Sequence, residues 1–336
     1  MVHPASSPTV VHVALPGDRL VWTPVGLDVC RGDRVTLLGS GRISWSDAHG
    51  GGAKFHLWGR VAGGVVFGCT QDTTTAVMDS TGPLQLRLHI DAGHGGDYAG
   101  ERGSLEVTVV RWPRDVDPVD GLESLAADPV LTHRVLAASE RARLLDPVVP
   151  PPGWRYLPDP GPGDIYRHAA VEGRPAIDVR CDDDAGVLAR DVAMLLEPAT
   201  TIEWSWRVES LPGIEPENTA WTHDLLSVAV RFDTGLDLSW FWSTVLQPDD
   251  DAFRCPIHGR GERETHVPVR RGPAGLGRWR RESRNVWSDH HRFIGPPPER
   301  IEAVWLIAVS HFGHHSCRAT FRDIALRTGD DRVQVL

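Results

Sequence analysis

Three histidines lie within five residues near the end of the chain: His311, His314 and His315. They occupy a turn between two strand-like runs, 301–309 and 317–326. Imidazole titrates near neutral pH, with an unperturbed pKa of roughly 6.5, and it is also a common metal ligand. This turn is therefore the first place in the sequence to look for proton transfer or metal binding.

Other histidines and carboxylates fall at or near the ends of expected strands, where loops of a β-sandwich can bring distant residues together. A carboxylate beside an imidazole fixes its tautomer and raises its pKa, which suits general acid–base catalysis. The predicted catalytic residues are His223, Asp224, Glu264, His266 and His311. His290 and His314 are predicted to contact substrate. The alternative is that these histidines cap turns and hydrogen bond to backbone carbonyls.

Tryptophans spaced by two residues share one face of a strand. Trp204 and Trp206 are expected in the core of a sandwich. Trp240 and Trp242 have two interpretations: an apolar floor for a sugar ring or polyketide-like substrate, or more core. They are predicted here as substrate-binding residues.

A transition-metal site needs three or four ligands within coordination distance and partners for their other ring nitrogens. The spacing HxxHH of the histidine turn matches no known metal signature. We therefore expect neither a transition metal nor an organic cofactor in this chain.

Composition excludes several classes of protein. The formal net charge of −10 argues against a duplex nucleic-acid binder. Lys54 is the only lysine, and no phosphate-binding loop, HExxH, GxSxG, CxxC or GxGxxG motif occurs. The first residues lack a signal-peptide pattern and no long apolar run follows, so we expect a cytoplasmic location without membrane insertion. A small molecule or saccharide is the expected partner, and the oligomeric state stays open.

The elements that would position these residues are strands. Short alternating runs separated by Gly, Asp and Ser fill residues 10–110, and a second series follows Trp154. Between them, Asp128 and Pro129 predict the start of one amphipathic helix that ends before Pro147. The sequence predicts an all-β fold of two antiparallel β-sandwich or jelly-roll domains, 1–112 and 154–336, joined by a helical, Pro-rich linker, 113–153.

Residues 17–45 (GDRLVWTPVGLDVCRGDRVTLLGSGRISW), 57–61 (LWGRV) and 95–109 (GGDYAGERGSLEVTV) resemble the galactose-binding domain of the soluble bacterial galactophilic lectins. The resemblance implies a jelly roll that holds a sugar through a calcium ion. Its calcium ligands would be Asp91, Asp97 and Glu101. Gly100 stands where the family has an Asn ligand, which removes one ligand.

Residues 154–327 resemble a family of uncharacterised bacterial sandwich domains, through WSWRVESLP (204–212), LSWFW (238–242), LGRWRRESRNVWSDHHRFIG (276–295) and RDIAL (322–326). That family has acidic and Asn residues in the last turn, where this chain has the histidines, and an Asp-Asp pair in place of His223 and Asp224. The resemblance implies no activity.

Two functions remain in view. The first is a bacterial enzyme, a lyase, cyclase or hydrolase, that uses histidine and carboxylate chemistry in a pocket of the C-terminal sandwich, with the lectin-like domain as scaffold. The second is a non-catalytic carbohydrate-binding protein with a calcium-assisted sugar site in the N-terminal domain.

Overall fold

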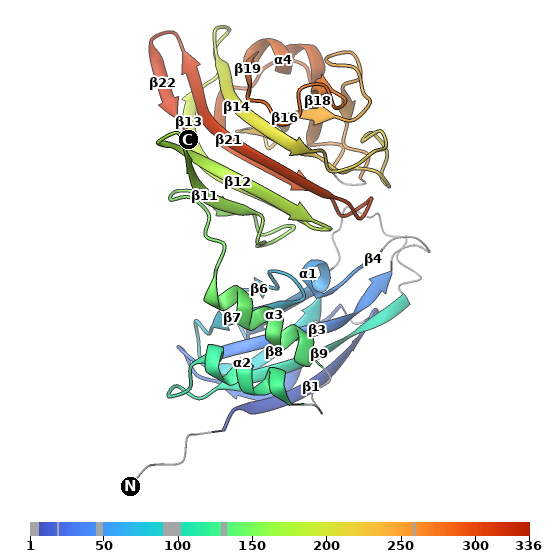
Figure 1. The fold of residues 1–336 in the computed structure, drawn as a ribbon, viewed down its shortest axis with the longest axis vertical. Helices are drawn as coiled ribbons and strands as arrows, with labels where there is room; N and C mark the ends of the chain where they lie inside the picture. The colour runs from blue at the N-terminus through green and yellow to red at the C-terminus, as the bar shows by residue number, and fades with distance from the viewer. Residues whose placement is uncertain (1–6, 19, 45–49, 90–101, 129–132, 258–259) are drawn as a thin grey trace. The chain divides into compact units, whose positions relative to one another are not determined.

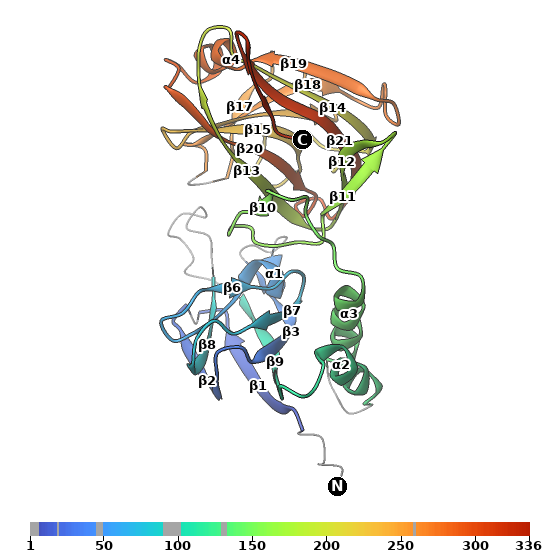
Figure 2. The same ribbon diagram turned by 90° about the vertical axis from the view of Figure 1, so that its left-hand side faces the viewer.

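The computed structural model describes residues 7–18, 20–44, 50–89, 102–128, 133–257 and 260–336. The chain divides into two compact units, Met1–Pro147 and Val148–Leu336 (Figures 1 and 2). Both are built mainly from antiparallel strands, which confirms the predicted all-β class. No helix among the described residues has the length and apolarity needed to cross a membrane.

The N-terminal unit is a sandwich of two sheets. Its five-stranded sheet has the order β1-β9-β3-β4, with β7 also paired to β3, and its four-stranded sheet has the order β2-β8-β5-β6. Leucines and valines that alternate along these strands fill the space between the sheets. The strands are β1 Thr9–Pro16, β2 Thr23–Val29, β3 Arg34–Ser44, β4 Gly50–Gly51, β5 Leu57–Val61, β6 Phe67–Gly68, β7 Thr73–Val77, β8 Gly82–Leu88 and β9 Arg102–Trp112.

The helical segment differs from the single predicted helix. A short helix α1 (Ala53–His56) precedes β5, and two helices, α2 (Pro118–Ala127) and α3 (Arg134–Leu145), follow β9. Asp128, expected to start a helix, instead ends α2, and Asp117 caps α2 by accepting a hydrogen bond from the Val119 amide. Both α2 and α3 pack around Trp112, and so they belong to the N-terminal unit.

The C-terminal unit is a larger sandwich. Its seven-stranded sheet has the order β10-β13-β20-β15-β16-β18-β17, and its six-stranded sheet has the order β11-β12-β21-β14-β19, with β22 also paired to β21. One neighbouring pair, β16 and β18, is parallel, which departs from the expected purely antiparallel pairing. A helix, α4 (Val286–Phe293), was not predicted. The strands are β10 Arg155–Tyr156, β11 Tyr166–Val171, β12 Arg174–Asp182, β13 Ala185–Leu195, β14 Thr201–Ser210, β15 Leu226–Phe232, β16 Asp237–Ser243, β17 Phe253–Arg254, β18 Glu264–Arg271, β19 Arg280–Asn285, β20 Arg300–Val309, β21 Ser316–Thr328 and β22 Asp331–Gln334.

Four tryptophans form the centre of this core. Trp204 and Trp206 of β14 face Trp240 and Trp242 of β16, with ring centroids 6.0 and 5.6 Å apart across the two sheets. All four side chains are at most 1% exposed. Trp240 and Trp242 are therefore core residues, which corrects their prediction as a substrate platform, because a ring enclosed between two sheets presents no face to a ligand.

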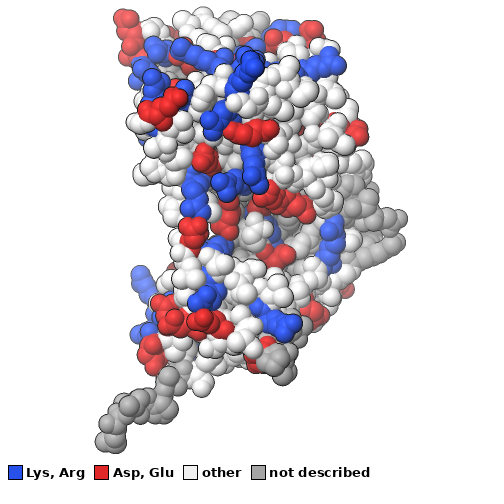
Figure 3. All heavy atoms as spheres, in the orientation of Figure 1, with Lys and Arg blue, Asp and Glu red and all other residues white. Residues whose placement is uncertain are grey.

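The surface charge is balanced locally. Figure 3 shows Lys and Arg side chains interspersed with Asp and Glu on the face it draws. Ion pairs on the six-stranded sheet include Arg322 with Glu172, at 2.7 Å, and Arg281 with Glu203, at 3.0 Å. Pairs of this kind neutralise arginine side chains locally on this sheet.

Candidate metal centre

The site begins with His266 on β18. Val267 points into the core between the sheets, so its neighbour His266 lies on the opposite, outer face of the seven-stranded sheet. The pairing of β16 with β18 places Ser239 beside His266, and the Ser239 Oγ is 2.6 Å from the His266 Nδ1. This hydrogen bond directs the other ring nitrogen, Nε2, away from Ser239.

The segment before β15 covers this part of the sheet and carries His223. Buried Glu217 anchors the segment, because its carboxylate accepts hydrogen bonds from the Ser243 hydroxyl and the Thr244 amide at 2.6 and 2.8 Å. The Nδ1–H of His223 donates to the Glu217 carbonyl at 2.8 Å. Because that nitrogen carries the proton in the neutral ring, the His223 Nε2 presents a lone pair.

Cys255 enters from the hairpin between β17 and β18. Its amide donates to the carbonyl of Glu264 at 3.0 Å. Its Sγ lies 3.4 Å from the His223 Nε2. The rings of His223 and His266 are 4.9 Å apart, so three side chains from three parts of the chain converge at one point. Their ligand atoms all lie within 4.8 Å of one another.

One polar atom of this cluster lacks a partner. Within the described part of the chain, the buried His266 Nε2 has no hydrogen-bond partner. The Glu264 carboxylate oxygen Oε2 lies 3.8 Å away, beyond hydrogen-bonding distance. Because an unpaired polar atom in a protein interior costs about 1–3 kcal/mol, its persistence requires an explanation.

Burial dominates the electrostatics. Desolvation lowers the pKa of His223 to about 4 and that of His266 well below its usual range, so both rings are neutral. Desolvation likewise raises the pKa of Cys255, and it raises the pKa of Glu264. Neutral imidazoles and a thiol are what a metal site offers before the ion displaces the thiol proton.

The distances fit a tetrahedral ion. Bonds of about 2.0–2.3 Å place tetrahedral ligand atoms roughly 3.3–3.8 Å apart. The Cys255 to His223 separation of 3.4 Å already lies in this range. Each imidazole also has the outer hydrogen bond that ligating histidines usually make, to the Glu217 carbonyl or the Ser239 hydroxyl. The Glu264 carboxylate, with Oε2 3.8 Å from the His266 Nε2, is placed to supply a fourth ligand.

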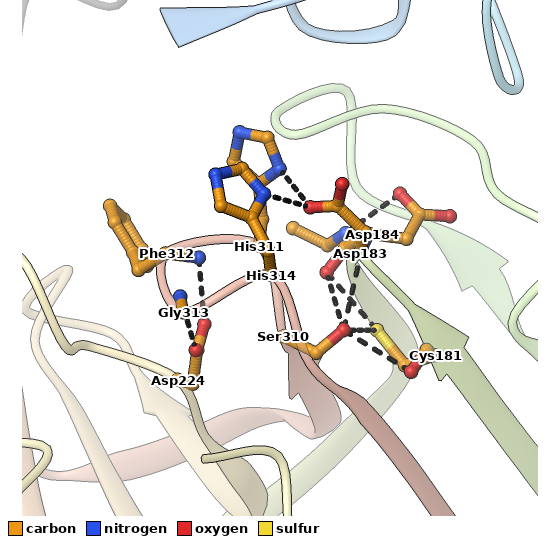
Figure 4. A network of polar contacts seen from close by, with 10 residues as sticks. Cys181, Asp183, Asp184, Asp224, Ser310, His311, Phe312, Gly313 and His314 are labelled. Atoms are coloured by element: carbon orange, nitrogen blue, oxygen red, sulfur yellow. Dashed lines mark hydrogen bonds and ion pairs between the residues drawn. The ribbon is translucent and has the colours of Figure 1, made fainter. Parts of the chain in front are cut away.

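The histidine turn forms a separate cluster with Asp183. The Asp183 Oδ1 is 2.9 Å from Nδ1 of both His311 and His314 (Figure 4). This cluster is more open, because the side chains of Asp183 and His314 are 54% and 46% exposed. His315, in the same turn, is exposed and lies outside this group.

The predicted catalytic residues are thus divided between two clusters. His223, Glu264 and His266 come together, whereas His311 lies with His314 and Asp183. The expected pairing of His223 with Asp224 is not formed. The Asp224 carboxylate instead accepts hydrogen bonds from the Phe312 and Gly313 amides, at 3.0 and 2.8 Å.

His290 does not join either cluster. Its Nδ1 donates to the Gly295 carbonyl at 3.1 Å, and its ring packs edge-on against Phe232 with centroids 4.8 Å apart. Phe232 ends β15, whereas His223 precedes that strand. The prediction of His290 as a substrate contact is therefore wrong, because α4 turns the ring into the domain. The residue is only 1% exposed.

Two residues of these clusters, Cys255 and Asp183, were not predicted as site residues. Cys255 looked like one of five scattered thiols, and no motif links it to a histidine. Asp183 lies in the run Asp182 to Asp184 between β12 and β13, which could have marked it as a tight turn. The predicted calcium ligands Asp91, Asp97 and Glu101 lie outside the described residues.

Several solved structures are similar to the chain, with low TM-scores. The EclA N-terminal domain, a PllA-like lectin, is 15% identical, covers 30% of this chain and 96% of its own, and has a TM-score of 0.27. The xyloglucanase domain of NopAA from Sinorhizobium fredii is 6% identical, with coverages of 53% and 93% and a TM-score of 0.30. The family 11 carbohydrate-binding module of Lic26A-Cel5E of Clostridium thermocellum is 8% identical, with coverages of 53% and 84% and a TM-score of 0.25. Scores of this size support no conclusion about ligand or activity.

No curated protein sequence matches the chain. One family model does match, over residues 153–325, which span nearly all of the C-terminal unit and both clusters. The chain therefore belongs to the family described as "Protein of unknown function (DUF3047)".

Proposed function

We propose that the C-terminal unit binds a zinc-type transition-metal ion through His223, Cys255 and His266, with Glu264 as the fourth ligand. The observation that carries the proposal is the unpartnered Nε2 of buried His266, which faces a thiol and a second imidazole. A metal ion would satisfy that nitrogen, whereas none of the described residues does so.

The ligand set suits a closed site. Two neutral imidazoles, one thiolate and one carboxylate give a total charge of −2, which neutralises a divalent ion in a buried environment. Ligation by four protein groups leaves no open position for substrate. The ion would therefore hold the segment before β15 and the β17–β18 hairpin onto the outer face of the seven-stranded sheet.

This role differs from the proton transfer that the sequence predicted for His223 and His266. A general acid or base must reach a substrate, and these two side chains are 4% and 1% exposed. Packing and a hydrogen bond on Nδ1 hold each ring in place. Metal ligation needs no change in the position of either ring, because each Nε2 is the nitrogen left for the ion.

Elemental analysis of the full chain, purified from zinc-containing medium and desalted, tests the proposal. We expect about one tightly held zinc ion per chain, and its loss in Cys255→Ser. The matched control is Cys30→Ser, which removes an exposed thiol and should leave the metal content unchanged.

Cobalt titration of the same variants identifies the ligand. A cobalt ion bound by Cys255 gives a thiolate charge-transfer band, which Cys30→Ser retains and Cys255→Ser lacks. A folded wild-type protein that takes up no zinc or cobalt, or an identical band in Cys255→Ser, would overturn the proposal. Near-native tryptophan fluorescence of the variant shows that its fold is intact.

Saccharide binding by the N-terminal unit is the second candidate. It is favoured by half-buried aromatic rings at the surface, where Trp58 stacks on His89 at 3.5 Å and the Arg60 guanidinium lies 4.2 Å from the Trp22 ring centre. Aromatic faces flanked by hydrogen-bond donors suit sugar rings. Titration with galactose should show binding that Trp58→Ala weakens, and a calcium chelator separates a calcium-assisted site from a direct one. No galactose binding with or without calcium would exclude a galactose site in this unit.

A further inference from the structure

Two chain crossings bring Asp183 next to the histidine turn. The β12–β13 connection and the β20–β21 connection both pass from one sheet of the C-terminal sandwich to the other. Because β12 pairs with β21 and β13 with β20, the register sets Asp182 opposite Ser316 and Ala185 opposite Val309. The two turns therefore lie side by side at one end of the unit.

Backbone contacts lock the turns together. The Asp183 amide donates to the His315 carbonyl at 2.9 Å, and the Ser310 amide donates to the Asp184 carbonyl at 2.9 Å. Figure 4 shows the Ser310 hydroxyl near Cys181 beneath the same junction, where it donates to the Cys181 carbonyl at 3.2 Å. The position of Asp183 relative to the histidines is thus set by the β12–β21 and β13–β20 strand pairs and not by a flexible loop.

Buried Asp224 shapes the histidine turn from below. Its two carboxylate oxygens accept hydrogen bonds from the Phe312 and Gly313 amides (Figure 4). Asp183 and His314 both take left-handed backbone conformations, with φ of 47° and 52°. Non-glycine residues rarely adopt this conformation, and it often marks functional sites. Here it turns both side chains toward His311.

The separations between the ligand atoms of Asp183, His311 and His314 match those of neighbouring ligands around an octahedral metal ion. Octahedral ligands at about 2.1 Å from an ion lie roughly 3.0 Å apart when they are neighbours. The two observed separations between imidazole nitrogen and carboxylate oxygen are 2.9 Å, and the two rings are 5.6 Å apart and nearly perpendicular. Two imidazoles and one carboxylate are a donor set that holds divalent transition metals while leaving coordination positions open.

We propose that Asp183, His311 and His314 bind a divalent transition-metal ion at the surface of the C-terminal unit, with solvent or an oxygen-donor ligand in the remaining positions. This site is separate from the buried one formed by His223, Cys255 and His266. The buried site is closed by four protein groups, whereas the surface site offers three ligands and faces solvent. An ion there is accessible to small molecules.

The competing explanation is that the Asp183 carboxylate only accepts hydrogen bonds from two imidazoles. In that case both Nδ1 atoms carry protons and no ion binds. A metal would displace those protons, because a ligating nitrogen must present its lone pair. The two explanations differ in metal stoichiometry.

The variants must keep the backbone of the turn. Asparagine tolerates the left-handed conformation better than other residues, so Asp183→Asn and His314→Asn remove a ligand with little strain. His315→Ala is the matched control, because it removes an exposed imidazole from the same turn that lies outside the cluster.

Cobalt titration of the metal-free full chain counts both sites. We expect two ions per chain in the wild type and in His315→Ala. His314→Asn and Asp183→Asn should lose the weaker ion, with at least about a tenfold fall in its affinity, and retain the thiolate charge-transfer band. Cys255→Ser should lose the band and keep the weaker ion.

These outcomes separate the two proposals. A single ion that His314→Asn leaves unchanged and Cys255→Ser removes would overturn the surface site and support the buried one. A single ion that His314→Asn removes would do the opposite. A second ion of equal affinity in wild type, His314→Asn and Asp183→Asn would show that it binds elsewhere, which also overturns this proposal.

Discussion

Removing the metal should lower the melting temperature of the C-terminal unit by about 10 °C. An ion that binds only the folded chain stabilises it by about 4.1 kcal/mol when its free concentration is 1,000 times its Kd. The unit spans Val148–Leu336, and an unfolding entropy of about 2.1 cal/mol/K per residue gives it roughly 0.4 kcal/mol/K. Dividing the stabilisation by the unfolding entropy gives the expected shift of about 10 °C.

Differential scanning calorimetry of the full chain, with excess zinc or with a strong chelator, measures this shift. Tryptophan fluorescence gives an independent reading, because nine of the thirteen tryptophans lie in the C-terminal unit. Cys30→Ser should show the wild-type shift. In Cys255→Ser most of the shift should be lost, since the thiolate ligand of the tighter site is gone and only the weaker surface ion remains.

A melting temperature that is the same in zinc and in chelator would refute this reasoning, provided the starting protein contains no residual metal by elemental analysis. So would an equal shift in wild type and Cys255→Ser, because the stabilisation would then come from another site. His314→Asn serves as a further control. It should keep most of the shift, since the surface site lacks a fourth protein ligand.

Three further predictions concern the fold. Burial lowers the pKa of His133 below 6.5, so the stability that the neutral ring contributes is complete above pH 6.5 and is lost as pH falls through the folded-state pKa. Thermal melts of the N-terminal unit between pH 7 and 5 should show this loss of stability, and the loss should be smaller in His133→Asn. Trp206→Ala should cost about 3–5 kcal/mol in urea unfolding, because the indole is fully buried, and a cost under 1 kcal/mol would contradict its core role. Gly41→Ala should cost about 1–3 kcal/mol in the same assay, since its φ is +100° and a Cβ would lie 2.2 Å from the Ser104 carbonyl oxygen; Gly63→Ala, also at positive φ but in open space, should cost less.

Strand content and two of the four core tryptophans could be predicted locally. A period of two sets which side chains share a face, so the fold class and the burial of Trp204 and Trp206 followed from the sequence alone. The same pattern could not show that Trp240 faces a second sheet. That depends on which strands pair across the domain, and pairing is a non-local property.

The site shows the same division. The sequence by itself determined which groups were available: the histidines at 223, 266, 311 and 314, and Glu264. Only the tertiary structure decided their partners. Cys255 meets His223 because a hairpin and a covering segment fold over one sheet face, and Asp183 meets His314 because two sheet crossings share an end. Ligand sets assembled from residues as much as 131 positions apart carry no local spacing signal, since distance in space is set by strand register and not by sequence separation.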